Sequence, residues 1–178
     1  MKGAAEAIVR LQHTYKLGEN AVASGKIPGL TTMAFEMTAL DCYLLGYHQA
    51  QLGFHDYAIE WLQVALKKQE DEIRQKIPQK IERSQILDWL QHSVYHYGNV
   101  SRALRISEEL VAIEPDFPNA KANVEFYKNI IQSMSREALE SLHRAPPRTK
   151  APAGHYEALC RGEGKLVSMH FERKSSYF

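Results

Sequence analysis

Three stretches of the sequence carry aromatic, amide and acidic side chains at spacings that place them on one face of a helix. Side chains three or four residues apart in a helix share a face. The predicted binding residues are Tyr43, Tyr47, Asp88, His92, Tyr95, Asn119, Asn123, Phe126 and Asn129, with Leu40, Ala50, Gln85 and Ala122 at the remaining positions of the same stripes. Aromatic walls with amide donors suit a polyproline peptide, because its carbonyls stay free and its rings stack. The alternative is that individual tyrosines belong to the core.

Other residues with reactive side chains do not form a recognisable site. His92 and His96 are four residues apart, a spacing that can bind metal, but no glutamate lies between them and no third ligand is near in sequence. No glycine-rich phosphate loop, nucleophile elbow or CxxC pair is present. Cys42 lies in a predicted helix and is expected to be a buried apolar thiol. We therefore predict no catalytic residue, no metal site and no cofactor in this chain.

Composition and charge exclude several classes of protein. The 178 residues contain 44% hydrophobic and 24% charged side chains, which is typical of a globular protein, and the net charge is +1. A nearly neutral chain has no overall field that attracts nucleic acid, and no run approaches the roughly 18 apolar residues of a membrane helix. Two cysteines exclude a disulfide-stapled scaffold. The early Glu6 argues against a signal peptide.

These side chains need helices to position them, and apolar residues recur at helical spacing along most of the chain. In the first helix this apolar stripe is formed by Ala4, Ala7, Ile8, Leu11 and Tyr15, and Gly18 is expected to end the helix. A connection is expected over 18–37, and a long polar loop over 67–83. Thr38 and Asp41 resemble a capping box, which marks a helix start. We predict helices over 1–17, 38–52, 57–68, 86–95, 103–113 and 118–134.

The middle helices repeat as pairs. Equivalent places are held by Ala58 and Ala103, by Leu62 and Ser107, and by Ala65 and Leu110. The period exceeds the roughly 34 residues of a tetratricopeptide repeat, and the polar loop accounts for the difference. The small residues Ala58, Ala65 and Ala103 let paired helices pack closely, and the last helix would be a capping helix.

The predicted fold is all-α. It is a right-handed tetratricopeptide-like array of about five helices, preceded by one helix and followed by a poorly ordered tail. The predicted divisions are a connecting region over 1–37, a binding domain over 38–134 and a linker with its following segment over 135–178.

Four stretches resemble the alpha subunit of collagen prolyl 4-hydroxylase. They lie in the order of that family and span nearly the whole chain, and the most specific is Leu159-Cys160-Arg161-Gly162-Glu163-Gly164. The others are Gly3–Tyr15, Asp41–Gly46 and Leu87–Gly98. The first resembles the end of the family's dimerisation region, the next two its peptide-substrate-binding domain, and the last the segment before its catalytic domain.

The resemblance implies a domain that holds proline-rich, collagen-like chains for hydroxylation by a catalytic domain that uses Fe2+, 2-oxoglutarate and ascorbate. The chain ends about where that domain would begin, so we expect no hydroxylation by this chain alone. The family also implies the endoplasmic reticulum lumen, a second alpha subunit and protein disulfide isomerase as partners, and neither nucleic acid nor membrane. The alternative is a diverged tetratricopeptide interaction scaffold without a collagen-like substrate.

Family binding positions map onto this sequence one by one. The family's groove asparagine matches Asn123, and its groove arginine is replaced by Asn119. Its groove tyrosines correspond here to Ala50, His92, Phe126 and Asn129. The family cysteine of the Leu-Cys-Arg-Gly motif matches Cys160, which the resemblance predicts to be a free thiol.

Overall fold

The computed structural model describes residues 2–27, 35–135 and 154–162, and this part of the chain is helical without strands. The all-α prediction is confirmed. Residues 28–34 and most of the predicted linker and tail lie outside the described ranges. The helices are α1 (Lys2–Tyr15), α2 (Glu19–Ala23), α3 (Ala39–Gln51), α4 (His55–Arg74), α5 (Arg83–His96), α6 (Val100–Ile113), α7 (Ala120–Ser133) and α9 (Gly154–Cys160).

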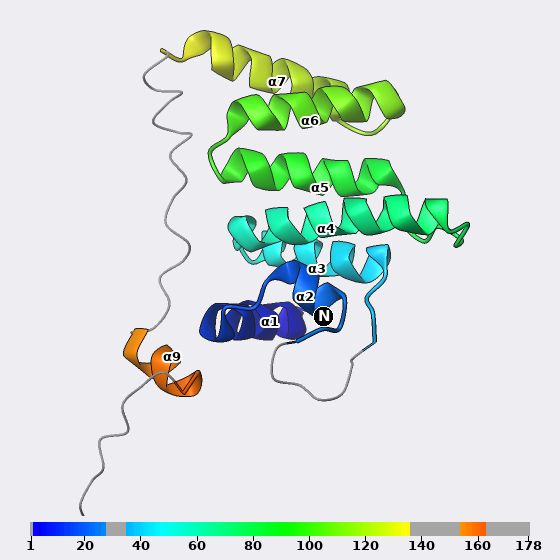
Figure 1. Cartoon of the computed structure of the whole chain (residues 1–178). Coiled ribbons are helices and arrows are strands. Elements are labelled where there is room, and N and C mark those ends of the chain that lie inside the picture. The colour runs from blue at the N-terminus through cyan, green and yellow to red at the C-terminus, as the bar shows by residue number, and fades with distance from the viewer. Residues whose placement is uncertain (1, 28–34, 136–153, 163–178) are drawn as a thin grey trace, which may run out of the picture.

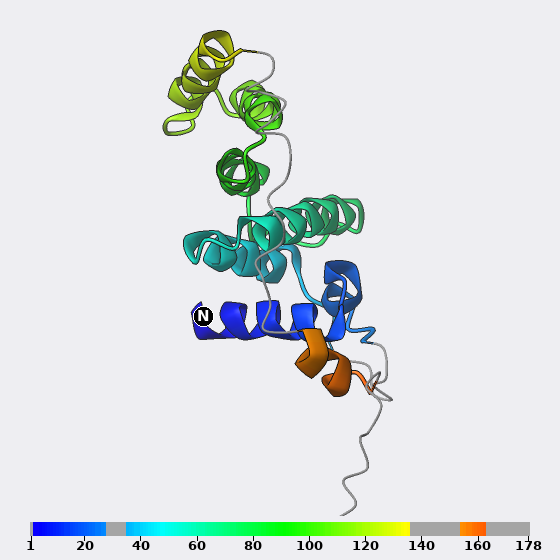
Figure 2. The same cartoon turned by 90° about the vertical axis from the view of Figure 1, so that its left-hand side faces the viewer.

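Helices α3 to α7 form a stack in which each packs on the next along the chain (Figure 1). The first helices of the two pairs, α3 and α5, also contact each other. Figure 2 shows the same stack from the side, with α7 at the end opposite α1 and α2. This arrangement confirms the predicted tetratricopeptide-like array.

The equivalent positions of the two pairs are all buried. Ala58 and Ala103 are both fully inaccessible to solvent, as are Leu62 and Ser107, and Ala65 and Leu110. The repeat inferred from sequence is therefore also a repeat of burial.

Close contact between α3 and α4 depends on Gly46. A Cβ atom at this position would lie 2.7 Å from Cγ of Leu62 and 3.2 Å from the carbonyl oxygen of Ala58. The start of α3 is fixed by the predicted capping box, in which the Asp41 amide donates to Thr38 Oγ1 and the Thr38 amide donates to Asp41 Oδ2.

Helix α4 is longer than predicted, so the polar loop is short. The helix continues to Arg74, and the connection covers only 75–82. Polar residues in the added turns have defined partners: Gln69 Nε2 donates to the carbonyl of Ile81 at 2.7 Å, and Glu72 accepts from the Ala39 amide at 2.8 Å. Lysine, glutamate and glutamine are also good helix formers, so a charged stretch need not be a loop.

The first helix ends earlier than predicted and buries a different face. Lys16, with a φ of 51°, adopts the left-handed conformation that follows Tyr15, and Gly18 instead precedes the unpredicted helix α2. The buried face of α1 carries Ala5, Val9 and Gln12. Leu11 and Tyr15 of the predicted apolar stripe are 50% and 45% exposed.

The predicted poorly ordered tail contains helix α9, which packs against α1. Glu157 lies 3.1 Å from His13 Nε2, and Arg161 Nη1 donates to the carbonyl of Thr14 at 2.7 Å. Among the described helices, none is both long and apolar enough to cross a bilayer.

Candidate peptide-binding groove

Aromatic rings form a continuous series across α3, α5 and α7, which we call the aromatic ladder. Its members are Tyr43, Tyr47, Trp89, His92, His96, Tyr95, Phe126 and Tyr127. Tyr47 meets Trp89 edge-on with 4.5 Å between ring centroids, which joins α3 to α5. Tyr95 meets Phe126 edge-on at 5.5 Å, which joins α5 to α7. Each separation lies in the range of favourable aromatic pairs.

An open cavity of about 410 Å³ lies beside the ladder, between α5 and the start of α7. As far as the described residues go, its walls combine aromatic rings with amides and one carboxylate. The lining residues are Asp88, Trp89, Gln91, His92, Phe117, Pro118, Asn119, Asn123 and Tyr127. Together the cavity and the aromatic ladder make the surface that we call the groove, which offers rings for stacking and amides for hydrogen bonding.

Gln91 connects the three helices around the cavity. Its Oε1 atom accepts from the Tyr127 hydroxyl of α7 and, at 3.4 Å, from Ser107 Oγ of α6. Its Nε2 atom donates to Asp88 Oδ1 at 3.3 Å. Because Gln91 is only 3% exposed, these bonds replace water that it cannot reach. They hold both the Asp88 carboxylate and the Tyr127 ring in place.

Burial controls the ionisation of the cavity side chains. It raises the pKa of Asp88, an effect that the bond from Gln91 opposes, and it lowers the pKa of His92, with a further contribution from His96. Burial also raises the pKa of Tyr43, with smaller contributions from Tyr47 and Asp88. Asp88 therefore interacts electrostatically with Tyr43 of α3, and it also lines the cavity together with residues of α7.

His55 brings a third imidazole to the histidines noted in the sequence. Its ring stacks on His96 at 4.8 Å with an interplanar angle of 11°, and lies 5.9 Å from His92. Burial, with repulsion from His96 and His92, lowers the pKa of His55 to about 4. Within the described ranges, no group of three or more His, Cys, Asp or Glu side chains is arranged to hold a metal ion.

The structure brings most of the predicted residues together. Asp88, His92, Asn119 and Asn123 line the cavity, while Tyr43, Tyr47, Tyr95 and Phe126 belong to the aromatic ladder. Their role in binding a peptide stays a prediction.

Two predicted positions, Asn129 and Ala50, lie outside the cavity and the aromatic ladder, and a third, Asn119, lines the cavity from a position before α7. Asn129 is exposed and does not line the cavity. Ala50 is 5% exposed and belongs to the core. Asn119 precedes α7 with a φ of 61°, a conformation that asparagine tolerates, and its side chain does not cap the helix.

Trp89, Gln91 and Tyr127 were not among the predicted groove residues. Each is next to a predicted residue in the sequence. The groove therefore uses a wider part of each helix than the four positions of the predicted stripe. A large aromatic side chain directly after Asp88 was the available signal for Trp89. The ring of Tyr127 beside Phe126 was likewise a signal. Gln91 gave none, because its pairing with Tyr127 joins residues from different helices.

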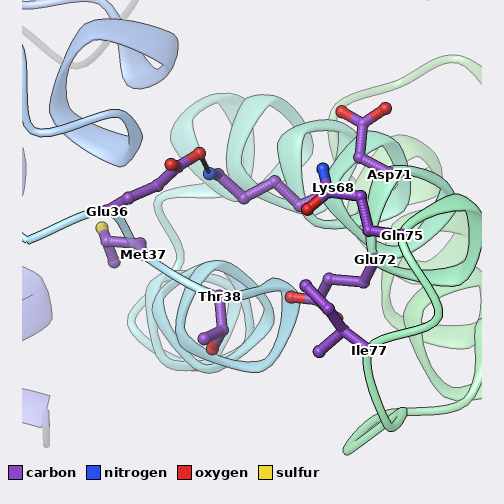
Figure 3. Close-up of a pocket in the computed structure, with 8 residues that line it drawn as sticks. All are labelled: Glu36, Met37, Thr38, Lys68, Asp71, Glu72, Gln75 and Ile77. Carbon is purple, nitrogen blue, oxygen red and sulfur yellow. Dashed lines mark hydrogen bonds and ion pairs between the residues drawn. The ribbon is translucent and has the colours of Figure 1, made fainter.

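A second cavity, of about 250 Å³, lies at the start of α3, and several residues that line it are paired with one another or with the backbone (Figure 3). Glu36 pairs with Lys68 at 2.6 Å across it. Glu72 accepts a hydrogen bond from the Ala39 amide. The Asp71 carboxylate points away from the Glu36–Lys68 pair, and Arg74 Nη1 lies 3.4 Å from Asp71 Oδ1. These contacts attach the segment before α3 to α4, which gives the cavity a structural role.

Comparison with known proteins gives the family of this array. A family model described as the prolyl 4-hydroxylase peptide-substrate-binding domain matches residues 39–133, from the first residue of α3 to the last of α7. The chain belongs to this family. The sequence resemblance to prolyl 4-hydroxylase alpha subunits is thereby confirmed.

Similar curated proteins include prolyl 4-hydroxylase subunit alpha-2 of Caenorhabditis elegans, which is 33% identical over 98% of this chain and 32% of its own length. Prolyl 4-hydroxylase subunit alpha-1 of Homo sapiens and subunit alpha-2 of Gallus gallus are each 29% identical, over 97% of this chain and 34% of their own length. The chain thus spans about a third of the length of these relatives. The match to the prolyl 4-hydroxylase peptide-substrate-binding domain covers helices α3 to α7 of this chain.

Proposed function

We propose that the groove binds proline-rich, collagen-like chains on behalf of a prolyl 4-hydroxylase. The observation that carries this proposal is the continuity of the aromatic ladder, from Tyr43 on α3 to Phe126 on α7. A polyproline II helix presents pyrrolidine rings at regular intervals, and it loses little conformational entropy on binding because it is already extended. A row of rings beside amide side chains is complementary to such a ligand.

The half-buried state of the ladder supports binding as well as packing. Phe126 is 48% exposed, and Trp89, Tyr43 and Tyr47 are only partly buried. Rings that were purely part of the core would be covered, as the fully buried Trp61 is. The exposed portions are the area that a peptide would cover.

Titration of the whole 178-residue chain with a (Pro-Pro-Gly) repeat peptide tests the proposal, with a glycine-serine peptide of equal length as the reference ligand. We expect saturable binding below about 1 mM for the proline peptide alone. Absence of binding by a folded helical protein would favour the alternative, an interaction scaffold without a collagen-like ligand.

Phe126→Ala tests the location of the site. It should weaken binding of the proline peptide by about 3- to 10-fold, because a ring pair contributes about 0.5–1.5 kcal/mol beyond its buried area. Phe35→Ala is the matched control, since Phe35 is 98% exposed and outside the aromatic ladder. Equal effects of the two substitutions would place the peptide elsewhere.

The cellular setting is part of the same proposal. The sequence resemblance to the collagen enzyme implies the endoplasmic reticulum lumen, a second alpha subunit and protein disulfide isomerase. Immunofluorescence of the natural gene product with a luminal marker, and its co-purification with protein disulfide isomerase, test these expectations. A cytosolic distribution of the gene product would contradict them.

A further inference from the structure

Within the described ranges, Asp88 is the one carboxylate that lines the groove cavity, and no lysine or arginine lines it with Asp88. Asp88 also takes part in no ion pair in the part of the chain that the structure describes. Its recorded hydrogen bond comes from a neutral amide, Gln91 Nε2. The lysines and arginines of α5 and α7 are engaged with other carboxylates. Arg83 pairs with Glu70 and Glu109, Lys121 lies 3.7 Å from Asp116, and Lys128 lies 3.7 Å from Glu108.

The remaining polar groups of the cavity do not neutralise this carboxylate. Asn119 and Asn123 are uncharged, and burial disfavours the charged form of His92. A partly buried carboxylate with one neutral donor is poorly compensated for the water it has lost. A ligand that brings a cation would supply the missing compensation in the complex.

Trp89 adds a second feature that favours a cation. Its indole lines the same cavity as Asp88 and meets Tyr47 and His92 edge-on. The face of an indole attracts guanidinium and ammonium groups, and arginine stacks on it more readily than lysine does. Asn119 and Asn123 offer amide oxygens for the further N–H donors of a guanidinium.

We propose that Asp88 makes the groove selective for proline-rich peptides that carry a basic residue, arginine above lysine. This inference rests on the proposed function, since it concerns which proline-rich chains the same groove prefers. The cationic group is held by the Asp88 carboxylate and the Trp89 ring, while the flanking prolines lie along the aromatic ladder. Asp88 is in this sense a specificity-determining residue.

Four peptides of one length test the inference on the intact chain. One contains proline and glycine alone, and the others carry arginine, its uncharged analogue citrulline, or glutamate at the central position. We expect arginine to bind about 10-fold more tightly than citrulline, glutamate to bind most weakly, and the arginine-to-citrulline ratio to decrease at high salt. This comparison uses the unmodified protein, so it does not depend on a variant folding.

Asp88→Asn then assigns the preference to this side chain. The variant should reduce the arginine-to-citrulline ratio of affinities from about 10 to about one. Glu125→Gln is the control, because Glu125 is an exposed carboxylate of α7 that does not line the cavity. That control should preserve the full preference for arginine.

The outcomes separate this inference from the proposed function. If the uncharged peptide binds but arginine and citrulline bind equally, selectivity by Asp88 is wrong and the polyproline groove stands. A preference for arginine that persists in a folded Asp88→Asn protein also overturns it. If none of the four peptides binds, the proposed function itself is wrong, and this inference fails with it.

Discussion

Replacing Gly46 by alanine should destabilise the protein, although alanine is the better helix former. Glycine within a helix normally costs about 1 kcal/mol relative to alanine, so at an open position the exchange would stabilise. Here the new Cβ would lie 2.7 Å from Leu62 Cγ, 3.1 Å from Leu62 Cδ2 and 3.2 Å from the carbonyl oxygen of Ala58. Leu62 is completely buried, and Ala58 contributes backbone, so neither can move aside at low cost.

The magnitude follows from two opposing terms. Overpacking a buried contact costs about 1–3 kcal/mol, and the gain in helix propensity offsets about 1 kcal/mol of it. We expect the free energy of unfolding to fall by about 1 kcal/mol for Gly46→Ala, measured by urea denaturation with helical circular dichroism as the signal. Gly18→Ala is the control, because no atom lies within 4 Å of a Cβ built there and its φ of −75° is ordinary.

A double-mutant cycle with Leu62→Ala decides whether the contact is the cause. Leu62→Ala alone should cost about 2–5 kcal/mol by creating a cavity. In that background Gly46→Ala should become neutral or stabilising, giving a coupling energy of about 1–2 kcal/mol. If Gly46→Ala stabilises the wild-type background as much as the Leu62→Ala background, α3 and α4 do not approach as described. Because Tyr47 follows Gly46, a displaced α3 would also separate Tyr47 from Trp89, and peptide affinity should fall in parallel.

Further predictions concern the core and the titrating groups. Tyr127→Phe leaves Gln91 Oε1 with only the longer bond from Ser107, so the free energy of unfolding should fall by about 1–2 kcal/mol, and an unchanged urea midpoint would argue against the buried network. Burial raises the pKa of Cys42 to about 12, so a maleimide should label Cys160 in the native protein and label Cys42 only after denaturation, as mass spectrometry would show. The folded-state pKa of His55 is about 4 against 6.5 in the unfolded chain, so the unfolded state binds more protons between these values and stability should decrease as pH falls from 6.5 to 4. His55→Phe should weaken that decrease in pH-dependent urea denaturation, and an identical slope in both proteins would exclude His55 as a contributor.

Local signals along the chain were sufficient for the array. The small residues Ala58 and Ala103 identified the second helix of each pair, and the capping box of Thr38 and Asp41 marked the start of α3 to the residue. These features depend on contacts within a helix or on what two adjacent helices require of each other. Such features can therefore be recognised from the order of residues along the chain.

The errors arise where tertiary contacts decide the outcome. The charged turns after Lys68 are helical because Gln69 and Glu72 find backbone partners in distant segments, which no periodicity reveals. On α1, Gln12 is buried and Leu11 exposed, because the Gln12 amide accepts from Trp61 Nε1 at 3.0 Å. A hydrogen bond to a buried partner thus places the polar Gln12 in the interior and leaves the apolar Leu11, on the predicted face, exposed to solvent.

The groove has two chemically different ends, and this difference bears on how a peptide would bind. Tyr43 and Tyr47 of α3 supply rings, whereas Asp88, Asn119 and Asn123 supply the hydrogen-bonding groups toward α7. Stacking on rings tolerates sliding along a polyproline helix, because each turn presents similar surface. Hydrogen bonds and a charge contact do not tolerate it, since their strength depends on direction and distance. For a peptide bound as proposed, the α3 end would therefore contribute affinity, and the α7 end would set the position and direction of the chain.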